Sequence, residues 1–180
     1  MKRLMIGAMA LAVSVTAVRC GGDSDNNNPT GPSTTGPIVF SSQMTAANEV
    51  PPITNADANA RGTATLTMNV PRDSSGVPTG AGTVNFAVQL SGFPAGTPII
   101  LGHIHVGAAG ATGSPVVNTG LTAAAPTLLN DGTANMSFND RPVSQADAVA
   151  IYTNPAGYYV NFHSQINPGG AVRGQMVRTQ

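Results

Sequence analysis

The sequence predicts an all-β fold, namely a Greek-key β-sandwich or flattened barrel of seven to eight antiparallel strands with one short helix. Two observations carry this prediction. Apolar and polar residues alternate over many short segments, and Gly, Pro, Asn and Asp separate those segments at regular spacing. Of the 180 residues 41% are hydrophobic, which is enough for the core of one domain.

The N-terminus is typical of an exported protein. Lys2 and Arg3 precede an apolar run over residues 4–18, so residues 1–19 are predicted to be a signal peptide. The single cysteine, Cys20, follows at once and resembles the lipidation site of bacterial lipoproteins, although Arg19 stands where that pattern has a small residue. Either Cys20 carries a lipid anchor, or the signal peptide is cleaved nearby without lipidation. Residues 20–37 are rich in Gly, Asn, Ser, Thr and Pro and are predicted to form a flexible tether.

The domain is expected over residues 38–180, and its first half reads as three strands. Residues 38–45 form the first, and the prolines at positions 51 and 52 follow it. Residues 62–70 and 84–90 alternate strictly between apolar and polar side chains, which indicates half-buried strands. The turn-forming residues 71–76 lie between them, so the two strands are predicted to form an antiparallel hairpin.

The second half continues in the same way, with one interruption. Ser144 is a plausible N-cap for a helix over residues 145–152, which Asn154 and Pro155 would stop. This helix, about two turns long, is expected to pack over one end of the sheets. The remaining strands are predicted at residues 99–106, 115–117, 133–139, 158–163 and 171–177.

All three histidines lie in two of these strands. His103 and His105 share one strand face because side chains alternate, and His163 shares a face with Tyr159 on the other strand. Three neutral imidazoles meeting on one sheet would supply three nitrogen ligands for copper or zinc, with one position left open. The alternative is that the histidines hydrogen-bond to the backbone of neighbouring turns. Both interpretations stay open.

Glu49 and Arg173 form the other notable polar pair, each set among apolar, Gly or Pro residues. We interpret them as a structural ion pair that closes the sandwich. No triad spacing, phosphate-binding loop or paired carboxylates can be read from the chain, so the sequence favours a protein that is not an enzyme.

Charge excludes one class of partner. Beyond the leader, five arginines and no lysine face eight acidic residues, which gives a net charge near −3. Binding to nucleic acid requires a clustered basic face, and these scattered arginines do not make one.

Several motifs in order resemble the chordin (CHRD) domain: NEVPP at residues 48–52, GHIHVG at 102–107, GSPVV at 113–117, YVNFH at 159–163 and NPGGAVRGQ at 167–175. The resemblance covers the chain from Ile38 to its end and implies an extracytoplasmic β domain. Ala171 departs from the family pattern, which usually has an acidic residue there.

The histidine strands are also loosely similar to the copper strands of Cu,Zn superoxide dismutases. That enzyme's bridging histidine, zinc ligands and disulfide are lacking, so its activity is not carried over. We therefore expect a secreted or lipid-anchored, non-enzymatic protein that serves at the cell surface as a binding or structural module with a protein or matrix partner. It would contact the membrane only through its N-terminal lipid. The alternative is a copper- or zinc-binding protein with a surface site of His103, His105 and His163 and a weak redox or metal-handling function.

Overall fold

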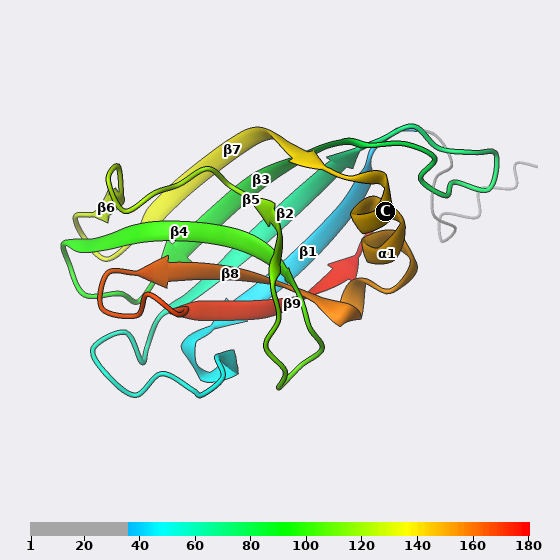
Figure 1. Ribbon diagram of the computed structural model, residues 1–180. Coiled ribbons are helices and arrows are strands. Elements are labelled where there is room, and N and C mark those ends of the chain that lie inside the picture. The colour runs from blue at the N-terminus through cyan, green and yellow to red at the C-terminus, as the bar shows by residue number, and fades with distance from the viewer. Residues whose placement is uncertain (1–35) are drawn as a thin grey trace, which may run out of the picture. The chain divides into compact units, whose positions relative to one another are not determined.

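The computed structural model describes residues 36–180, and Figure 1 shows their arrangement. The predicted signal peptide, Cys20 and nearly all of the predicted tether lie outside the described residues. No helix of the described part of the chain is long and apolar enough to cross a membrane.

The described residues form nine strands, one α-helix and two short 3-10 turns. The strands are β1 (Ile38–Thr45), β2 (Arg61–Asn69), β3 (Gly82–Ser91), β4 (Thr97–Val106), β5 (Pro115–Asn118), β6 (Thr127–Leu129), β7 (Ala134–Val143), β8 (Tyr158–Ser164) and β9 (Val172–Arg178). The helix is α1 (Gln145–Thr153), and the 3-10 turns are η1 (Ala46–Asn48) and η2 (Pro155–Gly157).

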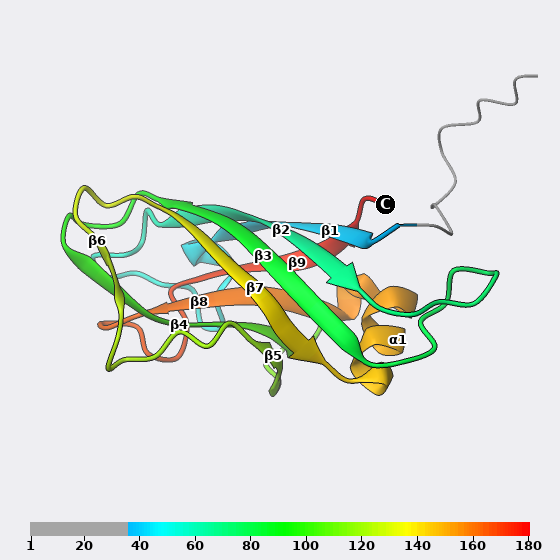
Figure 2. The same ribbon diagram turned by 90° about the horizontal axis from the view of Figure 1, so that it is seen from above.

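The strands form one antiparallel sheet folded into two layers, as Figures 1 and 2 show. The strand order is β5-β4-β8-β9-β1-β2-β3-β7, with β6 pairing beside β5 on β4. Strands β1, β2, β3 and β7 make one layer, and β4, β5, β8 and β9 make the other. The pairing of β1 with β9 joins the layers, so the all-β sandwich or flattened barrel that the sequence predicts is confirmed.

The core lies between the layers. On the first layer, register pairing aligns Phe40, Leu66 and Phe86 in one row across β1, β2 and β3, and all three are at most 1% exposed. Phe138 of β7 extends this row and stacks on Phe162 of β8 at a centroid distance of 6.3 Å. This contact joins the two layers directly. The apolar residues that alternate along the strands of both layers face the space between them.

The helix closes one end of the sandwich (Figure 2). Ser144 is its N-cap, as expected: its hydroxyl oxygen accepts a hydrogen bond from the Asp147 amide at 3.1 Å. Ala148 and Ile151 are fully buried against the core. The helix ends at Thr153, directly before Asn154 and Pro155.

Two details differ from the sequence expectation. The strand β6 was not predicted, because its three residues are too few to show a period. Val106, expected to face inward with Ile104, is 41% exposed. It is the last residue of β4, beyond a register shift between Ile104 and His105, so the alternation continues past the edge of the core.

Gly102 gives a first testable prediction. It pairs with Phe162 across β4 and β8, and a methyl group at its Cα would overlap the Phe162 ring. We expect Gly102→Ala to lower the free energy of unfolding by about 1–3 kcal/mol, the usual cost of overpacking a core. Urea denaturation measures it. Gly169→Ala, whose methyl would enter open space, is the matched control and should change stability by less than about 0.5 kcal/mol. Equal effects would contradict the packing argument.

Candidate metal centre

The register between β4 and β8 brings the three histidines together. Leu101 pairs with His163, His103 with Asn161 and His105 with Tyr159. Because residues two apart on a strand share a face, all three imidazoles project to the same side of this strand pair, away from the apolar core. One ring nitrogen of each histidine lies within 4.8 Å of those of the other two. The cluster that the sequence suggested is therefore formed.

The cluster is covered, which corrects the expectation of a surface site. His103, His105 and His163 are 7%, 9% and 6% exposed. Every residue of β8 is buried, including those whose side chains point away from the core. Loops 107–114 and 165–171 contribute the backbone groups that contact the rings, so the centre lies beneath a roof of loops.

Two backbone carbonyls fix the orientation and the tautomer of two rings. His105 Nδ1 lies 2.9 Å from the Gly113 carbonyl oxygen, and His163 Nδ1 lies 2.8 Å from that of Pro168. A carbonyl only accepts, so in the neutral rings both Nδ1 atoms carry the proton and both Nε2 atoms present a lone pair. Metal-binding histidines are oriented in the same way by their outer nitrogen.

The lone pairs point into the cluster. His163 Nε2 accepts a hydrogen bond from His103 Nδ1 at 3.2 Å. His105 Nε2 is buried and has no hydrogen-bond partner among the described residues. A buried acceptor without a partner costs free energy, so a ligand that bonded this nitrogen would stabilise the fold.

Burial keeps the three rings neutral. Desolvation lowers the pKa of His103 to about 4, with further lowering from the charges of His163 and His105. Desolvation also lowers the pKa of His105 and of His163, although the hydrogen bonds to Gly113 and Pro168 oppose it. Neutral imidazole is the form that coordinates a metal.

An aromatic side chain, Tyr159, and a cationic side chain, Arg173, are stacked in turn on His105. The Tyr159 ring stacks on His105 at a centroid distance of 4.9 Å and an interplanar angle of 9°. On Tyr159 lies the guanidinium of Arg173, with Cζ 3.5 Å from the ring centroid. Arg173 also donates to the Ala108 carbonyl at 2.8 Å and is 2% exposed.

Glu49 and Arg173 do not make the direct ion pair that we predicted. Glu49 accepts instead from the Asn161 amide at 2.6 Å, while Arg173 stacks on Tyr159 and donates to backbone. The charge of Arg173 still acts on Glu49 and lowers its pKa, but desolvation is larger and raises that pKa to about 7. The two residues are thus separate supports of the centre.

A buried hydrogen-bond network beneath the roof was not predicted from the sequence. This network, called the strut, is formed by Asn55, Asp57, Ser164 and Asn167. The fully buried Asp57 accepts from the Ser164 hydroxyl at 2.5 Å and from the Asn167 amide at 2.7 Å. Asn55 exchanges two hydrogen bonds with Asn167. These contacts tie the loop after η1 to the turn that carries Pro168. Ser164 directly follows His163, which was the only local signal; the partners are more than 100 residues apart in the chain.

Comparison with known proteins agrees with the motifs of the two histidine strands. The family model of the CHRD domain matches residues 40–176. The chain belongs to the CHRD domain family. Neither the comparison with curated proteins nor that with solved structures gives a match. The family assignment rests on this match, and the looser likeness to Cu,Zn superoxide dismutases stays a prediction.

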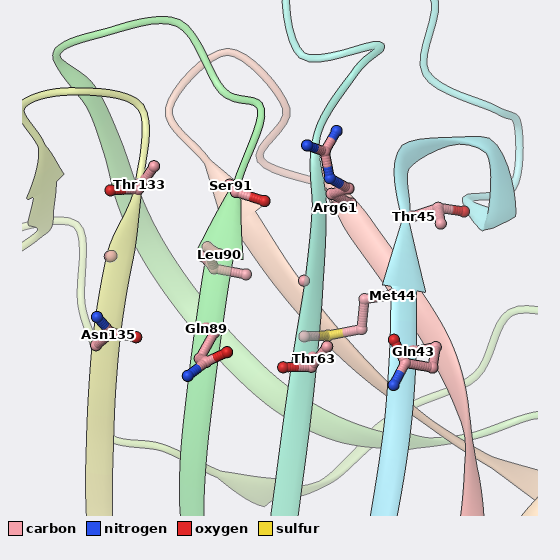
Figure 3. Close-up of a pocket in the computed structure, with 12 residues that line it drawn as sticks. Gln43, Met44, Thr45, Arg61, Thr63, Gln89, Leu90, Ser91, Thr133 and Asn135 are labelled. Carbon is pink, nitrogen blue, oxygen red and sulfur yellow. The ribbon is translucent and has the colours of Figure 1, made fainter.

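A second feature of this CHRD domain is a hollow on the other layer, shown in Figure 3. Side chains from β1, β2, β3 and β7 line it, and Arg61 is its only charged residue. In Figure 3, Gln43, Thr63, Gln89 and Asn135 form a row across the four strands, as their register requires. No carboxylate, histidine or cysteine is among the residues that line this hollow, so the lining itself supplies no general base for its hydroxyl groups.

The depressed pKa values of the histidines predict acid instability. Their neutral forms stabilise the fold fully above the unfolded pKa near 6.5, and this stability is lost as pH falls, down to about 4 for His103. Glu49 acts oppositely: its contribution is present below 4.5 and lost as pH rises through about 7. Between pH 6.5 and 4.5 the three imidazoles outweigh the single carboxyl, so the urea midpoint of the metal-free protein should fall.

His103→Gln is the variant that checks this prediction. It removes the group with the largest resolved downward shift, so the fall in urea midpoint between pH 7 and pH 5 should be smaller than in the unaltered protein. An identical pH dependence in both proteins would show that the imidazoles are not held neutral by the fold.

Proposed function

We propose that this CHRD-domain protein acts outside the cytoplasm as a non-enzymatic binding module, and that its ligand is a transition-metal ion held by His103, His105 and His163. One observation carries the proposal: the Nε2 lone pair of His105 is buried and unpartnered in a cluster of three imidazoles. A copper or zinc ion is the ligand that satisfies such nitrogens.

The spacing of the nitrogens supports this ligand. Metal–nitrogen bonds of about 2.0 Å at a tetrahedral centre place neighbouring nitrogens about 3.3 Å apart. His103 Nδ1 and His163 Nε2 are 3.2 Å apart, close to that edge, and for both to bind the ion the neutral His103 ring would carry its proton on Nε2. His105 completes the set within 4.8 Å, and its Nδ1 anchor on Gly113 leaves Nε2 directed at the other two rings.

The side chains beside the centre are engaged in contacts within the fold, which supports binding as its function. The described side chains next to it are Tyr159, Asn161 and Arg173, which stack on rings or donate hydrogen bonds within the fold. The predicted leader and Cys20 support an extracytoplasmic location, either secreted or lipid-anchored at the cell envelope.

Metal binding gives the third prediction. At a free metal concentration of one hundred times Kd, copper or zinc should stabilise the domain by about 2.7 kcal/mol and raise its Tm by roughly 5–10 °C. Dialysis with metal analysis should find one ion per chain. His103→Ala combined with His163→Ala removes two of the three nitrogens and should abolish both effects.

Asn118→Ala provides the matched control. Asn118 pairs with His103 from the opposite side, on β5, but is exposed and bonds its own loop at Gly120. Its substitution should leave stoichiometry and thermal shift unchanged. A wild-type domain that binds no metal below micromolar concentration, or a double variant that binds as well as wild type, would refute the proposal.

A second candidate function is attachment to a protein or matrix partner through the hollow of Figure 3. The observation favouring it is the row of neutral amide and hydroxyl groups over four strands, which can hydrogen-bond a polar, uncharged surface.

Charge substitution tests this second candidate. Thr63→Glu with Gln89→Glu would place two carboxylates in the row, and we expect at least a tenfold loss of adsorption to isolated cell-envelope material because the new charges would have to be desolvated. Metal binding should be unchanged. Equal adsorption by the wild type and the variant would exclude this face.

A further inference from the structure

The histidine centre has no negatively charged ligand among the described residues. All three ligands are neutral imidazoles, and no carboxylate belongs to the cluster. Among the influences on the pKa values of the three rings, the charged neighbours are the other histidines and Arg173, with no acidic residue. A bound ion would therefore meet no compensating negative charge at the ring nitrogens.

Arg173 is held in place as a fixed positive charge behind one ligand. Its guanidinium lies 3.5 Å from the centroid of Tyr159, whose ring stacks on His105 at 4.9 Å. Hydrogen bonds to the Ala108 carbonyl at 2.8 Å and to Gln175 at 3.3 Å fix its position. Because Arg173 is 2% exposed, solvent screens its charge poorly.

Two buried carboxyl groups, those of Glu49 and Asp57, are bonded to other residues. Glu49 is bonded to the Asn161 amide, and its burial favours the uncharged form. Asp57 accepts hydrogen bonds from Ser164 and Asn167, two other members of the strut beneath the roof. Neither residue bonds a histidine of the centre. Glu49 interacts with the charge of Arg173, but its burial favours the uncharged form, which weakens that compensation.

These observations indicate which ionic charge the histidine centre favours. The cost of burying an ion rises with the square of its charge, and its repulsion from Arg173 rises in proportion to it. A monovalent ion is therefore much less penalised here than a divalent one. Among metals that take imidazole ligands, copper alone has a common monovalent state, and Cu(I) is stable with three nitrogen ligands and no fourth.

We propose that the centre binds copper as Cu(I) in preference to Cu(II) and Zn(II), and that Arg173, acting through the Tyr159–His105 stack, sets this preference. The inference rests on the proposed metal-binding function and specifies its ligand. It runs against the usual order of divalent metals, in which Cu(II) binds nitrogen sites most tightly. Arg173 is thus a tuning residue that touches no metal.

The first experiment uses the unaltered protein. Under anaerobic conditions with ascorbate as reductant, bicinchoninate competes for Cu(I); in separate air-equilibrated titrations a chromophoric chelator competes for Cu(II) or Zn(II). We expect Cu(I) to bind at least tenfold more tightly than either divalent ion. Tighter binding of Cu(II) or Zn(II) than of Cu(I) would overturn the inference while leaving the proposed metal-binding function intact. No binding of any of the three would overturn both.

The second experiment tests Arg173 itself. Arg173→Gln keeps a hydrogen-bonding group but removes the charge, and should lower the ratio of Cu(I) to Cu(II) affinity on the order of tenfold. Arg173→Lys keeps the charge and should hold the ratio within about threefold of wild type. Arg178→Gln is the matched control: it removes the other stacked arginine of the same strand, which lies over Tyr152 at 4.2 Å and away from the centre.

The outcome of the variants is decisive in either direction. An unchanged ratio in Arg173→Gln would show that Arg173 supports the roof only, and a similar fall in Arg178→Gln would show a general effect of surface charge. Should Arg173→Gln fail to fold, the ratio in Arg173→Lys and in Tyr159→Leu, which breaks the stack but keeps the arginine, replaces it. The ratio of Cu(I) to Cu(II) affinity should then fall in Tyr159→Leu. A ratio equal to that of the wild type would overturn the role of the stack.

Discussion

The antiparallel register of β4 against β8 is the constraint on which both halves of this structure depend. It aligns Gly102 with Phe162 on the inner face, where the missing side chain leaves room for a ring that joins the two layers. On the outer face the same register sets His103 and His105 beside His163. A slip of one residue would exchange the two faces, so the centre cannot form without the core that it backs.

The outer face of this strand pair is not solvated, and that burial imposes a second constraint. Polar groups taken from water require partners, and the roof supplies them through Gly113, Pro168 and the strut of Asp57. Nearly every buried polar atom there is satisfied. The exceptions are His105 Nε2 and Asn161 Oδ1 beside the histidine rings and Asp57 Oδ1 in the strut. Among these atoms the ring nitrogen of His105 is the one that a metal ion would satisfy, as the proposed function requires.

Much of the sheet followed from local pattern, whereas the roof did not. Alternation over residues 62–70 and 84–90 predicted β2 and β3 and the hairpin between them, because that pattern depends only on which face meets the core. The shared face of His103 and His105 followed from the same rule. The stack of Arg173 on Tyr159 and the burial of the rings did not, since both depend on loops distant in sequence and without periodicity. For the same reason Glu49 and Arg173 could be paired by residue type but not placed.

Ala171 bears on the electrostatics of the centre. It is fully buried, its amide donates to the Phe162 carbonyl at 2.8 Å, and it precedes Val172, the residue paired with Phe162. The acidic residue that the CHRD resemblance places at this position would stand directly before β9, the strand next to the one that carries His163, and two residues before Arg173. Alanine there leaves the arginine without a carboxylate from its own strand. Under the proposed role of Arg173, family members with an acidic residue at this position would carry a compensating charge near the arginine and need not share a preference for an ion of low charge.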